Sequence, residues 1–396
     1  MSLSTHHRPA GGFRNPWPTA ARANAAGALF RWLVVERVAH PRAPDPDPRA
    51  AFPRTEPTFD LPRAAPDALT ATWVGHSTFL VQVGGWNVLT DPVWGERASP
   101  VAFAGPRRYT PPGVAFDALP PVDLVVLSHD HYDHLDAPTV RQLARRFPGA
   151  RWLAPLGVGA VLRALGAPNV AECDWWQSAL CERAGAGPLA ATCVPAQHFS
   201  GRGVTNRDAT LWSGWVLRAR DAGPARRVPN AAVPNAAVPD DTALTDAAPN
   251  GVMPAVYFAG DTGLHPEFAE VGRRCGPLAL ALLPVGAYAP RWFMRPVHCD
   301  PEDALLAYDA LCAGLAESHP SAEPPTFGAS HFGTFKLTDE PTDEPPRRTR
   351  AAWAVGGRDA GRLWVPHHGE TWRAGVAPPN APHHATPRRP TDAPRP

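Results

Sequence analysis

The chain of 396 residues lacks a hydrophobic run long enough to cross a bilayer, because the apolar stretch from Ala25 to Val35 is short and is interrupted by Arg31. It shows no secretory signal at its start. The six cysteines form no Cys-x-x-Cys pair, and a chain of this length can bury a core without disulfides. These absences argue against a membrane-spanning protein and a disulfide scaffold, and they predict a cytoplasmic protein with reduced thiols.

The chain also lacks an excess of charge of one sign. Its 38 basic and 37 acidic residues leave a formal net charge of +1, and no basic stripe is present, so a nucleic-acid partner is not expected. Hydrophobic residues make up 44% of the chain, which is enough for a large core in one or two domains. The 50 prolines predict that much of the backbone is irregular.

Short apolar segments that alternate with helical patterns predict a layered α/β fold. Three β-prone segments separated by glycine turns, at 69–74, 79–83 and 86–89, predict neighbouring antiparallel strands. Further strands are expected near residues 124–127, 152, 190–196, 211–217, 256–259 and 278–283. Helices are expected over residues 20–38, 137–147, 157–165 and 301–315.

Composition divides the chain into a main domain and flanking segments. The predicted boundaries are a disordered start at 1–12, an N-terminal arm packed on the main domain at 13–68, the main domain at 69–371 and a disordered tail at 372–396. Residues 221–250 contain a near-repeat with few large apolar groups, which predicts a surface insertion. The pairs His6–His7 and His383–His384 are expected to lie in solvent.

A cluster of histidines directly follows the apolar strand at 124–127, in the segment Ser128-His129-Asp130-His131-Tyr132-Asp133-His134. Alternate side chains of an extended segment point the same way, so His129 and His131 can bind one metal ion together. After the turn, Asp133 and His134 can face a second ion. Imidazole and carboxylate ligands suit zinc, and pairs of metal ions are used in hydrolysis. The pattern His-x-His-x-Asp-His therefore predicts a dinuclear metal site.

Three more metal-capable side chains, His198, Asp261 and His331, lie beyond this loop, next to small residues or at expected strand ends. Each one alone would more often be an ordinary loop residue, but together with the first motif they are predicted to complete the ligand set. Asp91 and His76 are candidates for groups that orient a ligand imidazole. The alternative for both is an ordinary place in a turn.

These motifs resemble those of the metallo-β-lactamase superfamily, whose histidine-rich loop and later His, Asp and His form a dinuclear site. The chain is most similar to one branch, the N-acyl-phosphatidylethanolamine-specific phospholipase D family. The similarity covers most of residues 13–370, apart from 221–250 and a region after Leu337. Matching segments include residues 15–19, 72–76, 89–92, 97–100, 174–176, 195–198, 260–263, 284–294 and 368–370. The resemblance implies an αβ/βα sandwich of two mixed sheets with helices on the outer faces.

The resemblance also implies a role for each residue of the site. One zinc ion would be bound by His129, His131 and His198, and a second zinc ion by Asp133, His134 and His331. Asp261 would bridge the two ions, and the carboxylates of Asp133 and Asp261 would be catalytic.

Two further residues, Tyr132 and His298, correspond to residues that contact the lipid in that family. For His298 the alternative is an ordinary polar residue that precedes a helix.

The reaction implied is the hydrolysis of N-acyl-phosphatidylethanolamine-like phospholipids to phosphatidic acid and N-acylethanolamine by a hydroxide held between the metal ions. A phospholipid substrate and peripheral contact with a membrane are the expected partners. A lactonase or another small-molecule phosphodiesterase is the enzymatic alternative, because the fold does not fix the reaction. The non-enzymatic alternative is a metal-stabilised binding protein, although the complete ligand set argues against it. The sequence leaves open the natural lipid, the metal ion and whether the chain forms a homodimer.

Overall fold

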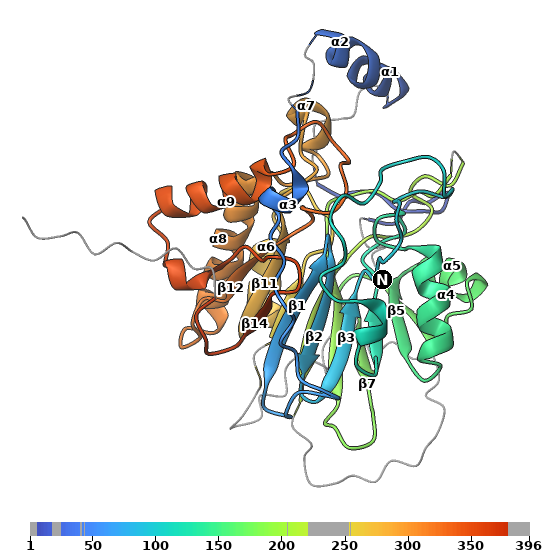
Figure 1. Cartoon of the computed structure of the whole chain (residues 1–396). Helices are drawn as coiled ribbons and strands as arrows, with labels where there is room; N and C mark the ends of the chain where they lie inside the picture. The colour runs from blue at the N-terminus through green and yellow to red at the C-terminus, as the bar shows by residue number, and fades with distance from the viewer. Residues whose placement is uncertain are drawn as a thin grey trace, which may run out of the picture.

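Two seven-stranded sheets packed face to face form the centre of the molecule (Figure 1). The computed structural model describes residues 6–17, 25–39, 42, 44–203, 205–220, 253 and 255–378. Each sheet is part antiparallel and part parallel, and helices cover both outer faces. The predicted αβ/βα sandwich of mixed sheets is therefore confirmed.

The first sheet has the strand order β14-β1-β2-β3-β4-β5-β6. Strands β14 to β3 pair antiparallel and β3 to β6 pair parallel. The strands are β1 (Leu69–Gly75), β2 (Thr78–Val83), β3 (Trp86–Thr90), β4 (Leu124–Val126), β5 (Arg151–Pro155), β6 (Val170–Cys173) and β14 (Thr371–Arg373).

The second sheet has the order β13-β12-β11-β10-β9-β8-β7. Strands β7 to β10 pair antiparallel and β10 to β13 pair parallel. The strands are β7 (Ser178–Cys181), β8 (Leu189–Val194), β9 (Gly214–Ala219), β10 (Ala255–Phe258), β11 (Leu278–Pro284), β12 (Thr326–Ser330) and β13 (Leu363–Trp364). The predicted insertion at 221–250 falls between β9 and β10 and lies outside the described residues.

Helices α4 (Ala137–Arg146) and α5 (Val158–Ala164) cover the first sheet, and α6 (Phe268–Cys275), α8 (Pro301–Ser318) and α9 (Glu344–Val355) cover the second (Figure 1). Asp300 caps α8 by accepting a hydrogen bond from the backbone N–H of Asp303, and Pro301 occupies the first position of the helix. The short helices are α3 (Pro48–Ala51), η2 (Phe116–Ala118), α7 (Arg291–Met294) and η3 (Ala360–Arg362).

The space between the sheets is filled by large apolar side chains, including Trp73, Trp86, Phe79, Trp215 and Phe258, all of them almost fully buried. Because each sheet is covered on both faces, strands such as β1, β2, β8 and β9 are buried along their whole length. This core holds the strand ends in fixed positions, which a site assembled from several strands requires.

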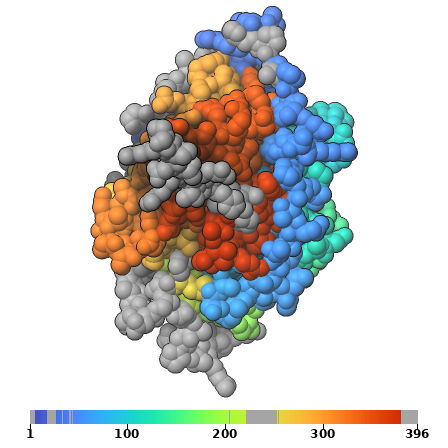
Figure 2. Space-filling model, turned by 60° about the vertical axis from the view of Figure 1, so that its left-hand side comes forward, coloured from blue at the N-terminus to red at the C-terminus, as the bar shows by residue number. Residues whose placement is uncertain are grey.

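Two N-terminal segments pack on the domain. Residues 6–17 lie against the end of β6, where His6 and His7 contact Asp174. Helix α1 (Ala25–Phe30), a π-helical turn η1 (Arg31–Glu36) and α2 (Arg37–Ala39) stand at the end of the molecule next to α7 (Figures 1 and 2). Trp32 is buried there, with its ring centroid 5.1 Å from that of Phe293. Among the described residues, no helix has the length and apolar character needed to span a membrane.

The ends of the chain differ from the sequence prediction. Residues 6–12 were expected to be disordered and to leave His6 and His7 in solvent, but His6 is buried against the ring of Trp175, at a centroid distance of 4.1 Å. The predicted tail at 372–396 begins too early, because strand β14 pairs with β1 through Arg373. Both differences arise from tertiary contacts that local composition does not reveal. Residues 379–396, with His383–His384, lie outside the described residues.

Helices α6 and α8 cross at two glycines. A Cβ atom at Gly314 would lie 1.8 Å from the carbonyl oxygen of Ala269, and one at Gly272 would lie 2.1 Å from that of Leu311. Both obstacles are backbone atoms, so a side chain at either position would push the helices apart.

We therefore expect Gly314→Ala to lower the free energy of unfolding by about 1–3 kcal/mol, the usual cost of overpacking, or by more. Urea titration would measure it. The control is Gly149→Ala, where an added Cβ meets no atom within 4 Å and stability should hardly change. Equal stability of the two variants would contradict this account of the packing.

Candidate metal centre

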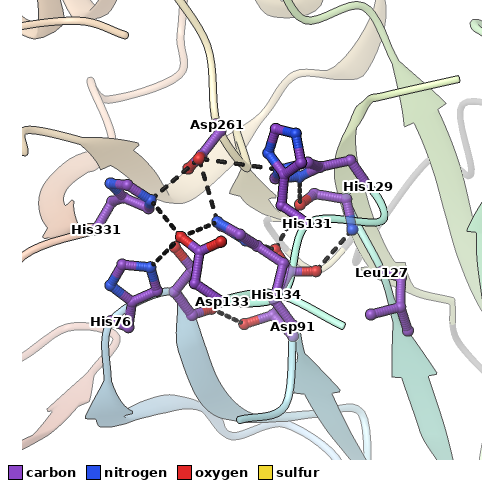
Figure 3. A network of polar contacts seen from close by, with 12 residues as sticks. His76, Asp91, Leu127, His129, His131, Asp133, His134, Asp261 and His331 are labelled. Atoms are coloured by element: carbon purple, nitrogen blue, oxygen red, sulfur yellow. Dashed lines mark hydrogen bonds and ion pairs between the residues drawn. The ribbon is translucent and has the colours of Figure 1, made fainter. Parts of the chain in front are cut away.

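Polar residues gather where strands of the same direction end. The pairings give β1, β3 and β4 of the first sheet one common direction, and give β8, β10 and β12 of the second sheet another. The residues that follow these strands converge at one edge of the sandwich (Figure 3). They are His76, Asp91, His129, His131, Asp133, His134, His198, Asp261 and His331.

The first group of donor atoms consists of His129, His131 and His198. The Nε2 atom of His129 lies 2.8 Å from Nδ1 of His131, and Nε2 of His198 lies 3.2 Å from the same atom. Both His129 and His198 are buried. Three ring nitrogens turned toward one point form a group that could bind one metal ion.

The second group consists of Asp133, His134 and His331, with His76 beside them. Oδ2 of Asp133 lies 3.4 Å from Nε2 of both His134 and His331, and 3.0 Å from Nε2 of His76. The structure thus brings the members of each predicted triad close together, with His76 as a fourth potential donor beside the second triad. Their roles as ligands remain a prediction.

Asp261 lies between the two groups. Its Oδ2 is 3.0 Å from Nε2 of His331 and 3.1 Å from Nε2 of His134, and it is 3.8 Å and 4.0 Å from Nε2 of His198 and His129. The Nε2 atoms of His134 and His331 are buried and make no hydrogen bond. Donor atoms that approach one another without bonding would suit a cation held among them, and the predicted bridging role of Asp261 is compatible with its position between the two groups.

The electrostatics of the cluster favour the same interpretation. Burial lowers the pKa of His129 and His198 well below the ordinary value, which leaves their imidazoles neutral, the form that binds metals. Burial alone would also lower the pKa of His331, but the carboxylates of Asp261 and Asp133 raise it to about 9. A site that draws positive charge this strongly suits divalent cations.

Groups behind the donor atoms fix the ring orientations. Asp91 is fully buried and its Oδ2 lies 2.6 Å from Nδ1 of His134, while its Oδ1 accepts the backbone N–H of Ser128 at 2.6 Å. The carbonyl oxygen of Val297 lies 2.9 Å from Nδ1 of His198. Asp91 thus contacts a predicted ligand imidazole, as expected. His76 hydrogen-bonds Asp133 and also packs against the ring of the predicted ligand His331, at a centroid distance of 4.2 Å.

Tyr132 and His298, the predicted lipid contacts, differ in their surroundings. His298 is buried, its Nδ1 has no hydrogen-bond partner and lies 3.9 Å from Oδ2 of Asp261, and burial lowers its pKa to about 3. Tyr132 is half-buried, and its hydroxyl donates to the carbonyl oxygen of Arg202 at 2.7 Å. His298 therefore faces the cluster with an available nitrogen, whereas the hydroxyl of Tyr132 supports a neighbouring loop.

Two residues that support the cluster, Arg202 and Asn15, were not predicted as site residues. Arg202 donates to the carbonyl oxygens of Asp130 and Leu135, at 2.6 and 2.8 Å, and so clamps both ends of the histidine-rich loop. Asn15 hydrogen-bonds both the carbonyl and the N–H of His198. Neither residue belongs to a metal motif. Only Asn15 lay in a segment marked by the family resemblance.

Three residues of the cluster have left-handed backbone conformations that are unusual outside glycine, with φ of 55° at His76, 34° at Asp91 and 60° at His331. Such conformations cost about 1–3 kcal/mol each and persist where the surrounding structure imposes them. Their concentration here marks this edge as the functional part of the molecule.

Comparison with known proteins agrees with this geometry. Residues 86–228 and 250–316, more than half of the chain, match the beta-lactamase superfamily domain. The chain belongs to this superfamily. A solved structure with a similar fold, the isothiocyanate hydrolase from Delia radicum gut bacteria, has a TM-score of 0.50 and 19% identity, with 76% of this chain and 98% of that chain covered. At this identity the likeness concerns the fold alone.

Two other proteins are more similar to this chain in sequence than that hydrolase is. An uncharacterised protein of Mycobacterium tuberculosis is 39% identical over 82% of this chain and 73% of its own length. The N-acyl-phosphatidylethanolamine-hydrolyzing phospholipase D 1 of Caenorhabditis elegans is 38% identical over 62% of this chain and 61% of its own length. Together with the His and Asp cluster, these relationships identify the protein as a metal-dependent hydrolase.

The contacts of Asp91 lead to a prediction. Asp91→Asn replaces the charged acceptor that orients His134, and loss of such a partner typically lowers metal affinity about 10–100-fold. Competition with a chromophoric zinc chelator would measure the change.

The control for this experiment is Asp117→Asn, because the side chain of Asp117 is fully exposed and its zinc affinity should match that of the wild type. An unchanged affinity in Asp91→Asn would show that Asp91 does not support the metal centre.

Proposed function

We propose that the protein is a zinc-dependent phosphodiesterase of phospholipase D type, which hydrolyses N-acyl-phosphatidylethanolamine-like phospholipids to phosphatidic acid and N-acylethanolamine. The observation that carries the proposal is the position of Asp261 between two triads of metal-binding side chains. The relationship to the phospholipase D of Caenorhabditis elegans supports the choice of a phospholipid. A cytoplasmic location remains a prediction.

The residues present fit a pair of zinc ions. The first ion would be held by His129, His131 and His198, the second by Asp133, His134 and His331, and Asp261 would reach both. This donor set of imidazole nitrogens and carboxylate oxygens suits zinc. When bound, the two ions would lower the pKa of a shared water toward neutrality and neutralise charge on the phosphoryl oxygens.

The protein's own groups would orient the reactants. Asp91 and the carbonyl oxygen of Val297 hold the rings of His134 and His198, so these rings need not reorganise during the reaction. His298 faces Asp261 with a nitrogen that has no partner in the protein. We assign it the task of contacting the phosphate or its leaving group. Tyr132 would contribute its ring edge to the substrate, since its hydroxyl is already engaged.

The test is phospholipid turnover by the purified zinc-loaded protein. We expect Asp261→Ala and His131→Ala to reduce hydrolysis of N-acyl-phosphatidylethanolamine to background, because each removes a donor group that no neighbour replaces. Release of N-acylethanolamine, followed by mass spectrometry, is the measurement. Chelation should abolish activity and added zinc should restore it.

His319→Gln is the control, because this histidine lies at the end of α8 and hydrogen-bonds Arg273 outside the cluster. It should retain full activity, and thermal melting would establish that all variants fold. Turnover of a sugar-phosphate lactone in place of the phospholipid would overturn the substrate assignment while leaving the metal site intact. Full activity in Asp261→Ala would overturn the mechanism.

A lipid substrate also requires access to a membrane surface, and the N-terminal helices offer an apolar face for it. Leu29, Phe30, Val34, Val35 and Val38 are all exposed. Soluble proteins rarely expose such a group of side chains without a partner. Trp32 fixes the segment to the domain through Phe293 and Asp339. We therefore assign this face to peripheral contact with the bilayer that contains the substrate.

Flotation with phosphatidylcholine vesicles that contain N-acyl-phosphatidylethanolamine would test the contact. We expect Phe30→Asp to reduce vesicle binding by about tenfold or more, since burying an apolar side chain of this size is worth about 1.5–3 kcal/mol. Val355→Asp on α9, at 89% exposure, is the matched control and should float like the wild type. Recovery of the wild type only in the lipid-free fraction would contradict the assignment.

A further inference from the structure

A second cluster of metal-binding side chains lies outside the centre described above. Nε2 of His6 lies 2.7 Å from Oδ1 of Asp174, and Nε2 of His7 lies 2.7 Å from Oδ2 of the same carboxylate. All three donor atoms are within 4.8 Å of one another. This group shares no residue with the two triads of the main centre.

Separate parts of the chain bring the three residues together. Asp174 directly follows β6, and the two histidines begin a short turn closed by a β-bridge between His7 and Phe13. Trp175 lies under the ring of His6, and its backbone N–H donates to Oδ1 of Asp174 at 2.8 Å. The donors are thus held by packing and by a hydrogen bond to the carboxylate, as supported metal ligands are.

Two imidazoles and one carboxylate form a known ligand set for first-row divalent metals. The donor spacing of 2.7 Å is close to the 2.8 and 3.2 Å between the ring nitrogens of the first triad. The side chains of His7 and Asp174 keep 30% and 19% of their surface exposed. Water can therefore complete the coordination from the solvent side.

We propose that His6, His7 and Asp174 bind an additional divalent transition-metal ion, which fastens the N-terminal segment 6–17 to the end of β6. The proposal stands independently of the phospholipase function. The ion would then stabilise the position of residues 6–17, the segment that also supports the main centre.

This support is the contact made by Asn15. Its side-chain amide donates to the carbonyl oxygen of His198 at 2.8 Å and accepts the N–H of His198 at 3.2 Å. Trp212 also donates to the amide oxygen of Asn15, at 3.1 Å. An ion at the beginning of this segment would therefore help to hold the backbone of a predicted zinc ligand.

The test is a zinc count on the whole protein. Wild type, Asp174→Asn and His7→Gln would be dialysed against buffers of defined free zinc, and bound zinc per chain would be measured by elemental analysis. We expect the wild type to hold one equivalent more than either variant once both sites are filled. His319→Gln, which removes a histidine elsewhere, should bind as much zinc as the wild type.

The proposal would be overturned if the wild type and both variants bound equal amounts of zinc at every free zinc concentration that fills the main centre. His6 and His7 would then only hydrogen-bond Asp174. His7 is partly exposed, so His7→Gln should fold even if Asp174→Asn does not, and thermal melting would establish this. The zinc count does not depend on phospholipid turnover. A failure to hydrolyse the phospholipid would therefore contradict the proposed function and leave this proposal unaffected.

Discussion

The structure depends on a balance of buried charge at one edge of the sandwich. Asp261 lies there with almost no access to water, and the side chain of Asp133 keeps only 13% of its surface exposed. Isolated buried carboxylates are costly. Imidazoles from both sheets surround them and supply compensating groups. Strands of common direction, a core of large aromatic side chains and helices on both outer faces all keep these groups in place. A divalent cation pair would complete the balance, which explains why a metal-dependent hydrolase uses this fold.

The surroundings of the cluster matter as much as its donor atoms. Asp91 orients one ring through a direct contact, and Arg202 clamps the loop that bears four of the donors by bonding two of its carbonyl oxygens. Asn15 does the same for the backbone of His198 from a segment far away in sequence. The site is therefore built from both sheets and from the N-terminal segment, and a change in any of them would alter metal binding.

The N-terminal residues connect the proposals. One part, residues 6–17, lies against the β6 end and reaches the main centre through Asn15. The other part, α1 to α2, is fixed by Trp32 and presents apolar side chains to the outside next to α7. Residues 1–68 were predicted from composition as a disordered start and an arm. Composition could not reveal the contacts that position these segments, because they join residues far away in sequence.

The sequence alone determined which residue types could carry the chemistry: the spacing of His129, His131, Asp133 and His134 predicts a metal-binding loop. Apolar runs located most strands and helix α8. It did not determine strands with weak local patterns, such as β6, β7 and β13, or the true start of β9 at Gly214. The family resemblance already implied a place for Asp261 between the two triads. Only the tertiary structure decided that the hydroxyl of Tyr132 bonds a loop and that His6 and His7 meet Asp174. The physical reason is that donor residues can be recognised from their type and spacing, whereas distances between separate strands are set by how the two sheets pack.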